Sequence, residues 1–251
     1  MGKGIILETR DLTRRFGRLT AVDRVSLEVR GGSFLSIIGP NGAGKTTFFN
    51  LLTGLLSPTG GTIWFKEAEI THLPPHLRSR QGLARSFQIT NLFPGLTVLE
   101  NLRLAAQSRG RHGFNYWTPA RSFRAYEERA WEVLEEVSLG GKGGVAAANL
   151  SHGDKRKLEI GLALAADPDL LLLDEPTAGM SLEEVPGVLE VIRRIRVARS
   201  CTVVMVEHKM DVVMSLSDSI AVLHQGALLA RGTPEEIAAN PFVQSAYLGG
   251  D

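Results

Sequence analysis

The chain has 251 residues, of which 43% are hydrophobic and 22% are charged. A chain of this length can bury about 70% of its unfolded surface, so it needs no disulfides or metal clips to fold. Lys and Arg number 28 against 27 Asp and Glu, and the net charge of +1 creates no global field that would favour a nucleic acid or an anionic lipid surface.

The compartment is indicated by the lone cysteine and by missing targeting signals. Cys201 lies beside an apolar run, which favours a small buried hydrophobe in a reducing compartment. Residues 1–8 lack the sustained apolar region of a signal peptide, and no stretch approaches the ~20 apolar residues of a membrane span. We therefore expect a cytoplasmic protein that acts at a membrane only through a partner.

Two kinds of strand are predicted along the chain. Short runs with alternating polarity predict antiparallel strands with one solvated face, at 5–9, 25–29 and 62–65. Continuously apolar runs are typical of parallel strands covered by helices, and these lie at 34–38, 170–173 and 202–206. The sequence therefore predicts an α/β fold with a mixed sheet, whose ligands bind beyond the carboxyl ends of the parallel strands.

The middle of the chain, from about 97 to 145, has a helical pattern. Thr118 and Pro119 offer an N-cap and a proline at the first helical position, and Gly140-Gly141 offers a stop. Apolar residues recur between these signals at helical spacing, and we expect Trp131 to pack in the core rather than to bind a ligand. One folded unit with a helical insertion is the simplest interpretation.

A last helix is predicted near the end of the chain. Thr233-Pro234-Glu235-Glu236 matches a capping box with proline at the first helical position, and Pro241 is expected to end that helix.

The segment after the strand at 34–38 matches the phosphate-binding (Walker A) pattern G-x-x-x-x-G-K-[ST]. It comprises Gly39, Pro40, Asn41, Gly42, Ala43, Gly44, Lys45, Thr46 and Thr47. Glycines let the backbone N–H groups face phosphate oxygens, and the following helix adds the positive end of its dipole. Lys45 is expected to contact the β- and γ-phosphates, and the Thr46 hydroxyl to bind Mg²⁺.

Two carboxylates end the apolar strand at 170–173. Asp174 suits Mg²⁺ ligation, and Glu175 suits the polarisation of an attacking water. A kinase has no need to hold a hydrolytic water, so this pair favours a nucleotide hydrolase.

Further motifs surround that strand. Leu150-Ser151-His152-Gly153-Asp154 precedes it, and Ala178-Gly179-Met180-Ser181 follows it. Together with the Walker A loop, this order resembles the ATP-binding cassette (ABC) family, whose signature is usually L-S-G-G-Q. The resemblance runs from about Leu7 to Leu248.

The resemblance also implies roles for single residues. Phe16 stands where the family has an aromatic that stacks on adenine, and Gln88 where it has a glutamine that touches Mg²⁺ and senses the γ-phosphate. His208 matches the switch histidine on the γ-phosphate. Ser151 and Gly153 belong to the signature, which addresses the ATP bound by the opposite subunit. The implied catalytic set is Glu175, His208, Gln88 and Lys45, the implied metal ligands are Thr46, Gln88 and Asp174, and the implied cofactors are ATP and Mg²⁺.

The resemblance further implies one ABC ATPase domain over residues 1–251. A P-loop NTPase of this type has a mixed sheet core, an antiparallel β subdomain and a helical insertion. We expect the nucleotide-binding core at 1–88 and 166–251 and the helical subdomain at about 89–165.

Three positions depart from the family pattern. His152 replaces the second signature glycine, Asp154 replaces the glutamine, and Ser181 replaces the aspartate that ends the loop after Glu175. Asp154 suits the dipole at a helix start but repels phosphate, so we expect it to point away from the nucleotide. Ser181 can hydrogen-bond but cannot form an ion pair across the seam between subunits.

A subfamily is suggested by Leu158-Glu159-Ile160-Gly161 and by the ending Ala246-Tyr247-Leu248-Gly249, which look like those of branched-chain amino-acid uptake ATPases. The resemblance implies an ATP-hydrolysing importer subunit that pairs with a copy or a related ATPase, on the cytoplasmic face of the inner membrane. Its partners would be permease subunits and, indirectly, a solute-binding protein.

A urea or short-chain amide importer is an alternative, as is a soluble non-transport ABC ATPase. The DNA-repair type needs a long coiled coil, which residues 103–145 are too short to form, and no nucleic-acid partner is expected.

The segment after Gln88 is apolar for a loop. Leu92, Phe93 and Leu96 flank a Pro94-Gly95 turn, and they are candidates either for docking a short helix of the membrane partner or for packing the helical insertion on the core.

Overall fold

The computed structural model describes residues 4–86, 92–108, 121–198 and 201–248. These residues form two compact units: unit 1 comprises Met1–Gln81 and Arg199–Asp251, and unit 2 comprises Gly82–Ala198. The predicted helical subdomain at 89–165 falls within unit 2, which also includes the strand at 170–174 and the helix after it. The division at 88/89 and 165/166 stays a prediction.

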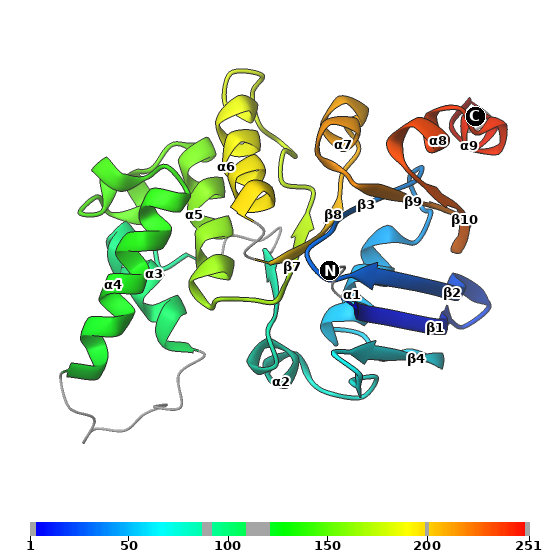
Figure 1. The fold of residues 1–251 in the computed structure, drawn as a ribbon, viewed down its shortest axis with the longest axis horizontal. Coiled ribbons are helices and arrows are strands. Elements are labelled where there is room, and N and C mark those ends of the chain that lie inside the picture. Colours follow the sequence, from blue (N-terminus) through cyan, green and yellow to red (C-terminus); the bar gives the residue numbers. More distant parts are fainter. Residues whose placement is uncertain (1–3, 87–91, 109–120, 199–200, 249–251) are drawn as a thin grey trace. The chain divides into compact units, whose positions relative to one another are not determined.

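An antiparallel sheet in unit 1 has the strand order β2-β1-β4-β5 (Figure 1). Its strands are β1 (Ile5–Phe16), β2 (Leu19–Arg30), β4 (Gly60–Phe65) and β5 (Ala68–Glu69). The predicted antiparallel strands are confirmed, but β1 and β2 are longer than the alternating runs. Their register shifts at bulges, and Asp11 and Arg24 adopt a φ of 46° there. A bulge interrupts the alternation of side chains, so the sequence pattern breaks where the strand continues.

Unit 1 also contains parallel strands. They are β3 (Phe34–Ile38), β8 (Thr202–Val206) and β9 (Ser219–His224), with β10 (Ala227–Gly232) antiparallel to β9. β3 pairs in parallel with β8 on one side and with β9 on the other. Every residue of β3 and β8 is buried, as the apolar runs predict. The carboxyl ends of these strands therefore meet at one edge of the sheet.

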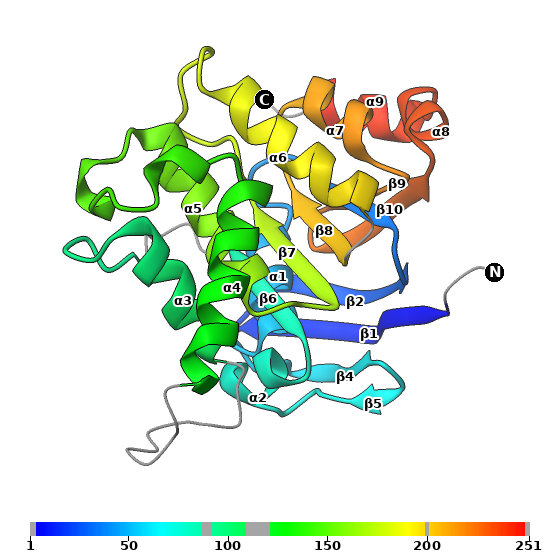
Figure 2. The ribbon, with the colours of Figure 1, turned by 60° about the vertical axis from the view of Figure 1, so that its left-hand side comes forward.

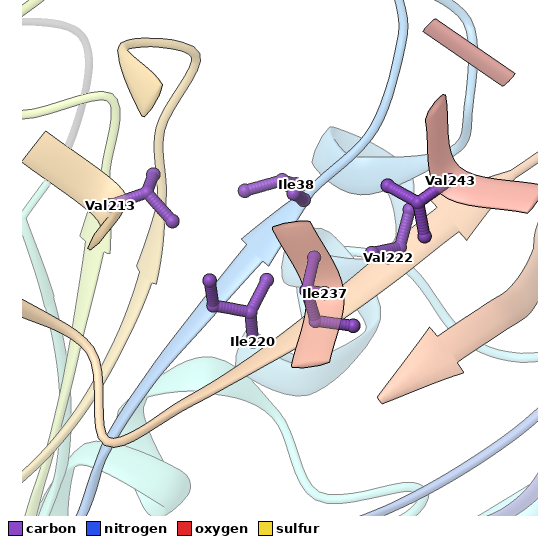
Figure 3. Close-up of a cluster of buried hydrophobic side chains, with 6 residues drawn as sticks. All are labelled: Ile38, Val213, Ile220, Val222, Ile237 and Val243. Atoms are coloured by element: carbon purple, nitrogen blue, oxygen red, sulfur yellow. The ribbon is translucent and has the colours of Figure 1, made fainter. Parts of the chain in front are cut away.

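The helices of unit 1 are α1 (Lys45–Thr53), α2 (Pro75–Arg80), α7 (Met210–Leu216), α8 (Pro234–Ala238) and α9 (Pro241–Leu248). The capping box on α8 is confirmed: the Thr233 hydroxyl accepts from the Glu236 N–H, and the Glu236 carboxylate accepts from the Thr233 N–H. Pro241 opens α9, so it begins a helix as well as following one. A hydrophobic cluster joins α7, α8 and α9 to the parallel strands (Figure 3); it consists of Ile38, Val213, Ile220, Val222, Ile237 and Val243.

Unit 2 pairs β6 (Leu83–Ser86) in parallel with β7 (Leu170–Asp174). Its helices are α3 (Val98–Ser108), α4 (Arg121–Glu136), α5 (His152–Ala165) and α6 (Val185–Ala198), with short 3₁₀ turns at Gly140–Lys142 and Ala147–Asn149. α5 packs against α3, α4 and α6 and against β6 and β7 (Figure 2). Within the described part of the chain, no helix combines the length and the apolar character needed to cross a membrane.

The predicted helix start at Thr118 and Pro119 lies outside the described residues. The rest of the helical region differs from the sequence prediction in two respects. α4 ends at Glu136, before the Gly140-Gly141 signal. The expectation that Trp131 is core is wrong, because 45% of the residue is exposed, whereas Ala130, Leu134 and Val137 are fully buried. The buried stripe is narrower than the apolar pattern, and Trp131 lies at its margin with its ring edge against Gly143.

A buried arginine holds the far end of α1. Arg78 is 1% exposed, and its guanidinium donates to the carbonyls of Leu51 and Leu52 (both 2.7 Å), Thr71 (2.9 Å) and Leu73 (2.8 Å). Burial lowers the pKa of Arg78 to about 10. The cation lies at the C-terminal end of α1, where the helix dipole favours positive charge.

We predict that Arg78→Met lowers the free energy of unfolding by about 3 kcal/mol, because several buried carbonyls lose their donor. Urea unfolding of both proteins measures the difference. Arg80→Met, on the exposed side of the same helix, is the matched control and should change stability by less than about 0.5 kcal/mol. Equal effects of the two substitutions would contradict the role assigned to Arg78.

Candidate functional site

The loop that joins β3 to α1 is forced into its path by tight packing. A Cβ at Gly39, where φ is 154°, would lie 2.1 Å from the Leu223 carbonyl oxygen. A Cβ at Gly44, where φ is 97°, would lie 2.3 Å from the Ala21 carbonyl oxygen. Only glycine fits both positions, and Gly44 is then the N-cap of α1. The predicted strand–loop–helix context of the Walker A pattern is present.

Lys45 opens α1 and is 6% exposed. Its Nζ donates to the carbonyl oxygens of Gly39 (2.6 Å) and Pro40 (2.9 Å), so the ammonium lies within the curve of the loop. Thr46 and Asn41 are exposed, while Ala43 is buried under the loop. The arrangement presents a cation, a helix N-terminus and an accessible hydroxyl together, which suits an anionic phosphate chain.

His208 follows β8 at the same sheet edge as the loop, since β8 and β3 are parallel neighbours. Glu207, which is 3% exposed, turns its carboxylate back to accept from the backbone N–H groups of His208 (2.6 Å) and Lys209 (3.3 Å). These bonds fix the backbone of His208, and its side chain stays exposed. The histidine is thus held on a rigid turn and accessible for a ligand at this edge.

A cavity of about 550 Å³ lies between the Walker A loop and α9. Residues 40–43, His224 and Gln225 line it on one side, and Phe242, Ser245 and Ala246 of α9 on the other. Burial raises the pKa of Tyr247, and the Gly39 N–H, which donates to the phenol oxygen, opposes that rise. The C-terminal helix is therefore a neighbour of the loop, which no spacing in the sequence indicates.

Phe16 ends β1 at the turn into β2, and 43% of the residue is exposed. The Arg14 guanidinium lies 4.6 Å from the centroid of its ring. The ring therefore has accessible surface beside a cation.

In unit 2, Asp174 ends β7 and is fully buried. One of its carboxylate oxygens is paired with Arg85, which is on β6. The other, Oδ1, has no hydrogen-bond partner among the described residues. Glu175 follows in the left-handed region with a φ of 46°, and it is partly exposed. Asp174 therefore has one buried carboxylate oxygen that accepts no hydrogen bond from the described residues. Glu175 begins the loop that follows β7.

The signature segment caps α5. Ser151 is the N-cap, and its hydroxyl accepts from the Asp154 N–H at 3.2 Å. The Asp154 carboxylate pairs with Lys142 and with Lys157. Burial opposes its ionisation, but the two lysines and Ser151 outweigh burial and keep the pKa of Asp154 below its ordinary value.

Glu184 ties the signature to the loop after β7. Its Oε1 accepts from the Gly153 N–H at 2.8 Å, and its Oε2 accepts from the N–H and the hydroxyl of Ser181 at 3.4 and 3.3 Å. The N–H and the hydroxyl of Ser181 therefore both donate to Glu184 of the same chain. The Gly153 N–H is the main cause of the lowered pKa of Glu184.

The predicted site residues are divided between the units. Unit 1 brings the Walker A loop and His208 to one sheet edge and carries Phe16 on its antiparallel sheet. Unit 2 carries Ser151, Gly153, Asp174 and Glu175. Gln88 lies outside the described residues. Sequence reasoning missed Arg85, Glu184 and Tyr247, because none belongs to a spaced motif.

Two family models match the sequence. The model described as "ABC transporter" matches residues 22–178, and the model described as "Branched-chain amino acid ATP-binding cassette transporter" matches residues 227–251. The second match covers β10, α8 and α9, and Leu229 of β10 and Phe242 of α9 line the cavity beside the Walker A loop.

Relatives and solved structures cover almost the whole chain. The high-affinity branched-chain amino acid transport ATP-binding protein BraF of Pseudomonas aeruginosa is 45% identical over 249 residues, which are 97% of this chain and 98% of BraF. An ATP-binding cassette of an ABC transporter in its ADP conformation aligns with a TM-score of 0.85 at 30% identity, covering 98% of this chain and 99% of that one. A dimeric cassette bound to ADP and Pi aligns with a TM-score of 0.75 at 26% identity, over 91% and 99% of the two chains.

The lowered pKa of Glu184 predicts a pH-dependent contribution to stability. Because the folded-state pKa lies below the ordinary 4.5, the stabilisation is present above that value and is lost as pH falls through the folded pKa. Urea unfolding should show Glu184→Gln less stable than the wild type at pH 7, and the gap should close as the pH falls below 4.5 and through the folded-state pKa. The control is Glu183→Gln, an exposed neighbour, with an unchanged midpoint throughout. A gap that widens on acidification would contradict this bonding.

Proposed function

The chain belongs to the ATP-binding cassette transporter family, and on that basis we propose that it is the ATP-hydrolysing subunit of a membrane importer for branched-chain or other amino acids. The single observation that carries this proposal is the Walker A loop of unit 1, with Lys45 held inside it at the start of α1. As a member of this family, the chain binds ATP and ADP and is an ATPase.

Nucleotide binding is assigned to the loop and to Phe16. Backbone N–H groups of the loop and of the N-terminus of α1 donate hydrogen bonds to the phosphate oxygens, and Lys45 supplies a full positive charge. The accessible face of Phe16 stacks on the base without reading its edge. The assignment of the loop is supported by the path that Gly39 and Gly44 impose, and that of Phe16 by its exposed side chain at the end of β1.

Mg²⁺ is assigned to Thr46, Gln88 and Asp174. The fit is supported by Asp174, because its Oδ1 is buried and, among the described residues, accepts no hydrogen bond. Carboxylate and hydroxyl oxygens are ligands that this hard cation prefers. When bound, the cation neutralises charge that develops on the phosphates.

Hydrolysis is assigned to Glu175 and His208. Glu175 accepts a hydrogen bond from the attacking water and orients it, while His208 and Lys45 stabilise charge on the transferring phosphoryl group. The support for His208 is the Glu207 carboxylate, which fixes its backbone while the side chain stays exposed. Because most of this catalysis is positioning and electrostatics, rigid turns at both residues suit the chemistry.

The working assembly is a pair of cassettes joined to permease subunits. Ser151 and Gly153 at the start of α5 contact the ATP that the partner's Walker A loop holds. The dimeric relative bound to ADP and Pi supports the pairing. We assign the chain to the cytoplasmic face of the membrane, where closure and reopening of the pair drive the permease.

The solute class is supported by the C-terminal segment and by relatives. Residues 227–251 match a model of branched-chain amino acid cassettes, and BraF is named for that transport. Transport of radiolabelled leucine by the complex reconstituted in vesicles tests the class, and transport of urea but not leucine would reject it.

We predict that Glu175→Gln binds Mg·ATP but hydrolyses it at least about 100-fold more slowly, because the amide cannot accept the proton of the water. Gel filtration with ATP should show a stable dimer of this variant, formed with the partner ATPase if the pair is heteromeric.

Lys45→Ala is the comparison variant for this test. It should also lose hydrolysis, but together with ATP affinity, because the charge on the phosphates is gone. Wild-type turnover in Glu175→Gln would contradict the assignment of Glu175, and wild-type turnover in Lys45→Ala would contradict that of the loop.

The docking surface for the permease is assigned to Leu92, Phe93 and Leu96. Phe93 is 57% exposed although its backbone is fixed, since the buried Asn101 amide accepts from its N–H at 2.8 Å and donates to its carbonyl at 3.1 Å. A rigid backbone with an exposed aromatic side chain favours docking over packing of the core.

We predict that Phe93→Ala leaves basal ATPase activity and thermal stability of the isolated subunit nearly unchanged, because the side chain is mostly exposed. Solute-stimulated ATPase activity and transport by the reconstituted complex should fall together, by about tenfold. Val197→Ala, which shortens a side chain of α6 that is more exposed than Phe93 (81% against 57%), is the control and should change neither. A collapse of basal activity and stability in Phe93→Ala would assign Phe93 to the core instead.

A further inference from the structure

The turn that carries Glu175 is held by one side chain from α5. Glu175 lies in the left-handed region, which a non-glycine residue keeps only when its surroundings enforce it. Arg156 provides that enforcement. Its Nη2 donates to the carbonyls of Asp174 (2.9 Å) and Glu175 (2.5 Å), and its Nε donates to the carbonyl of Pro176 (3.0 Å).

The guanidinium is itself fixed. Arg156 is 8% exposed, and its Nη1 donates to Glu159 Oε2 at 2.8 Å. Glu159 lies on the same helix, and its side chain is about as buried as that of Arg156. Its negative charge therefore offsets the positive charge of the guanidinium. A planar guanidinium with donors in fixed directions can hold successive carbonyls in one geometry, which a lysine ammonium cannot do.

Arg156 also belongs to the helix that Ser151 caps. Ser151 begins α5 and Arg156 follows within its first turns, so the signature and the Glu175 turn share one rigid element of unit 2. Glu184 adds a second tie at the start of the same helix through Gly153. A displacement of α5 therefore carries the backbone of Glu175 with it.

We propose that Arg156 is a positioning residue for ATP hydrolysis, which fixes the Glu175 turn and couples it to the signature helix. This inference rests on the assignment of Glu175 as the residue that orients the attacking water. Arg156 does not touch the nucleotide in this account; it acts through the carbonyls of residues 174–176.

The test compares steady-state hydrolysis by the full chain and by Arg156→Met. The kcat should fall about 10- to 100-fold, because a shift of about 1 Å in a catalytic group has an effect of that size. The KM for ATP and the stoichiometry of nucleotide binding should stay within twofold, because the Walker A loop belongs to unit 1. A purely structural role would instead lower the kcat and the binding stoichiometry in parallel.

Arg156→Lys keeps the result interpretable if the methionine variant does not fold. It retains the positive charge beside Glu159, but one ammonium cannot serve all of these carbonyls. We expect near-normal thermal stability with a kcat still at least fivefold below wild type. A wild-type kcat in Arg156→Lys would overturn the proposal.

The matched control is Arg129→Met. Arg129 is another partly buried arginine of unit 2, which donates to the Leu164 carbonyl of α5 and pairs with Glu132 and Glu136, away from Glu175. Its kcat should stay within twofold of wild type. An equal loss of kcat in Arg129→Met would show that any disturbance of α5 has this effect, and it would overturn the proposal.

Coupling to Glu175 is measured in a double-mutant cycle under single-turnover conditions. In the Glu175→Gln background, Arg156→Met should slow residual hydrolysis by less than twofold, because the side chain that it orients is already disabled. The same 10- to 100-fold loss in both backgrounds would overturn the proposal. If Glu175→Gln alone hydrolyses ATP like the wild type, the assignment of Glu175 is wrong. That single variant therefore separates a failure of the proposed function from a failure of the role of Arg156.

Discussion

The close approach of two backbone carbonyls to Gly39 and Gly44 determines the path of the Walker A loop in unit 1. The Leu223 and Ala21 carbonyl oxygens leave no room for a Cβ at either glycine, so the loop has one path between β3 and α1. Arg78 holds the opposite end of α1 through the carbonyls of Leu51 and Leu52. A helix fixed at both ends presents Lys45 and Thr46 with little conformational entropy left to lose on binding.

Much of the fold follows from the pattern of apolar residues. The apolar runs at 34–38 and 202–206 coincide with β3 and β8 because a strand that is buried on both faces carries apolar side chains on both, without alternating polar residues. The pattern fails where a tertiary neighbour decides exposure. Trp131 continues an apolar helical run, but other segments of unit 2 cover Ala130, Val133, Leu134 and Val137 instead. The pattern of one helix does not say which of its residues a neighbour covers.

The candidate site divides in the same way. The Walker A loop, Asp174 and Glu175 could be predicted because their chemistry requires fixed residue types at fixed spacing after a strand. Arg85, Glu184 and Arg156 could not, since each acts on a segment distant in sequence through backbone or carboxylate contacts. Such supporting residues obey geometry rather than spacing, and only the folded chain brings them to their partners.

Asp154 illustrates how a departure from a family pattern is compensated. One carboxylate faces two ammonium groups, those of Lys142 and Lys157, so the start of α5 keeps a local excess of positive charge although an acid replaces the usual amide. The three residues form one linked set of charges in which none is independent. Replacing Asp154 with glutamine alone would leave the two lysines in mutual repulsion near the start of α5. Substitutions at these positions are therefore expected to covary among relatives, as a unit inherited together.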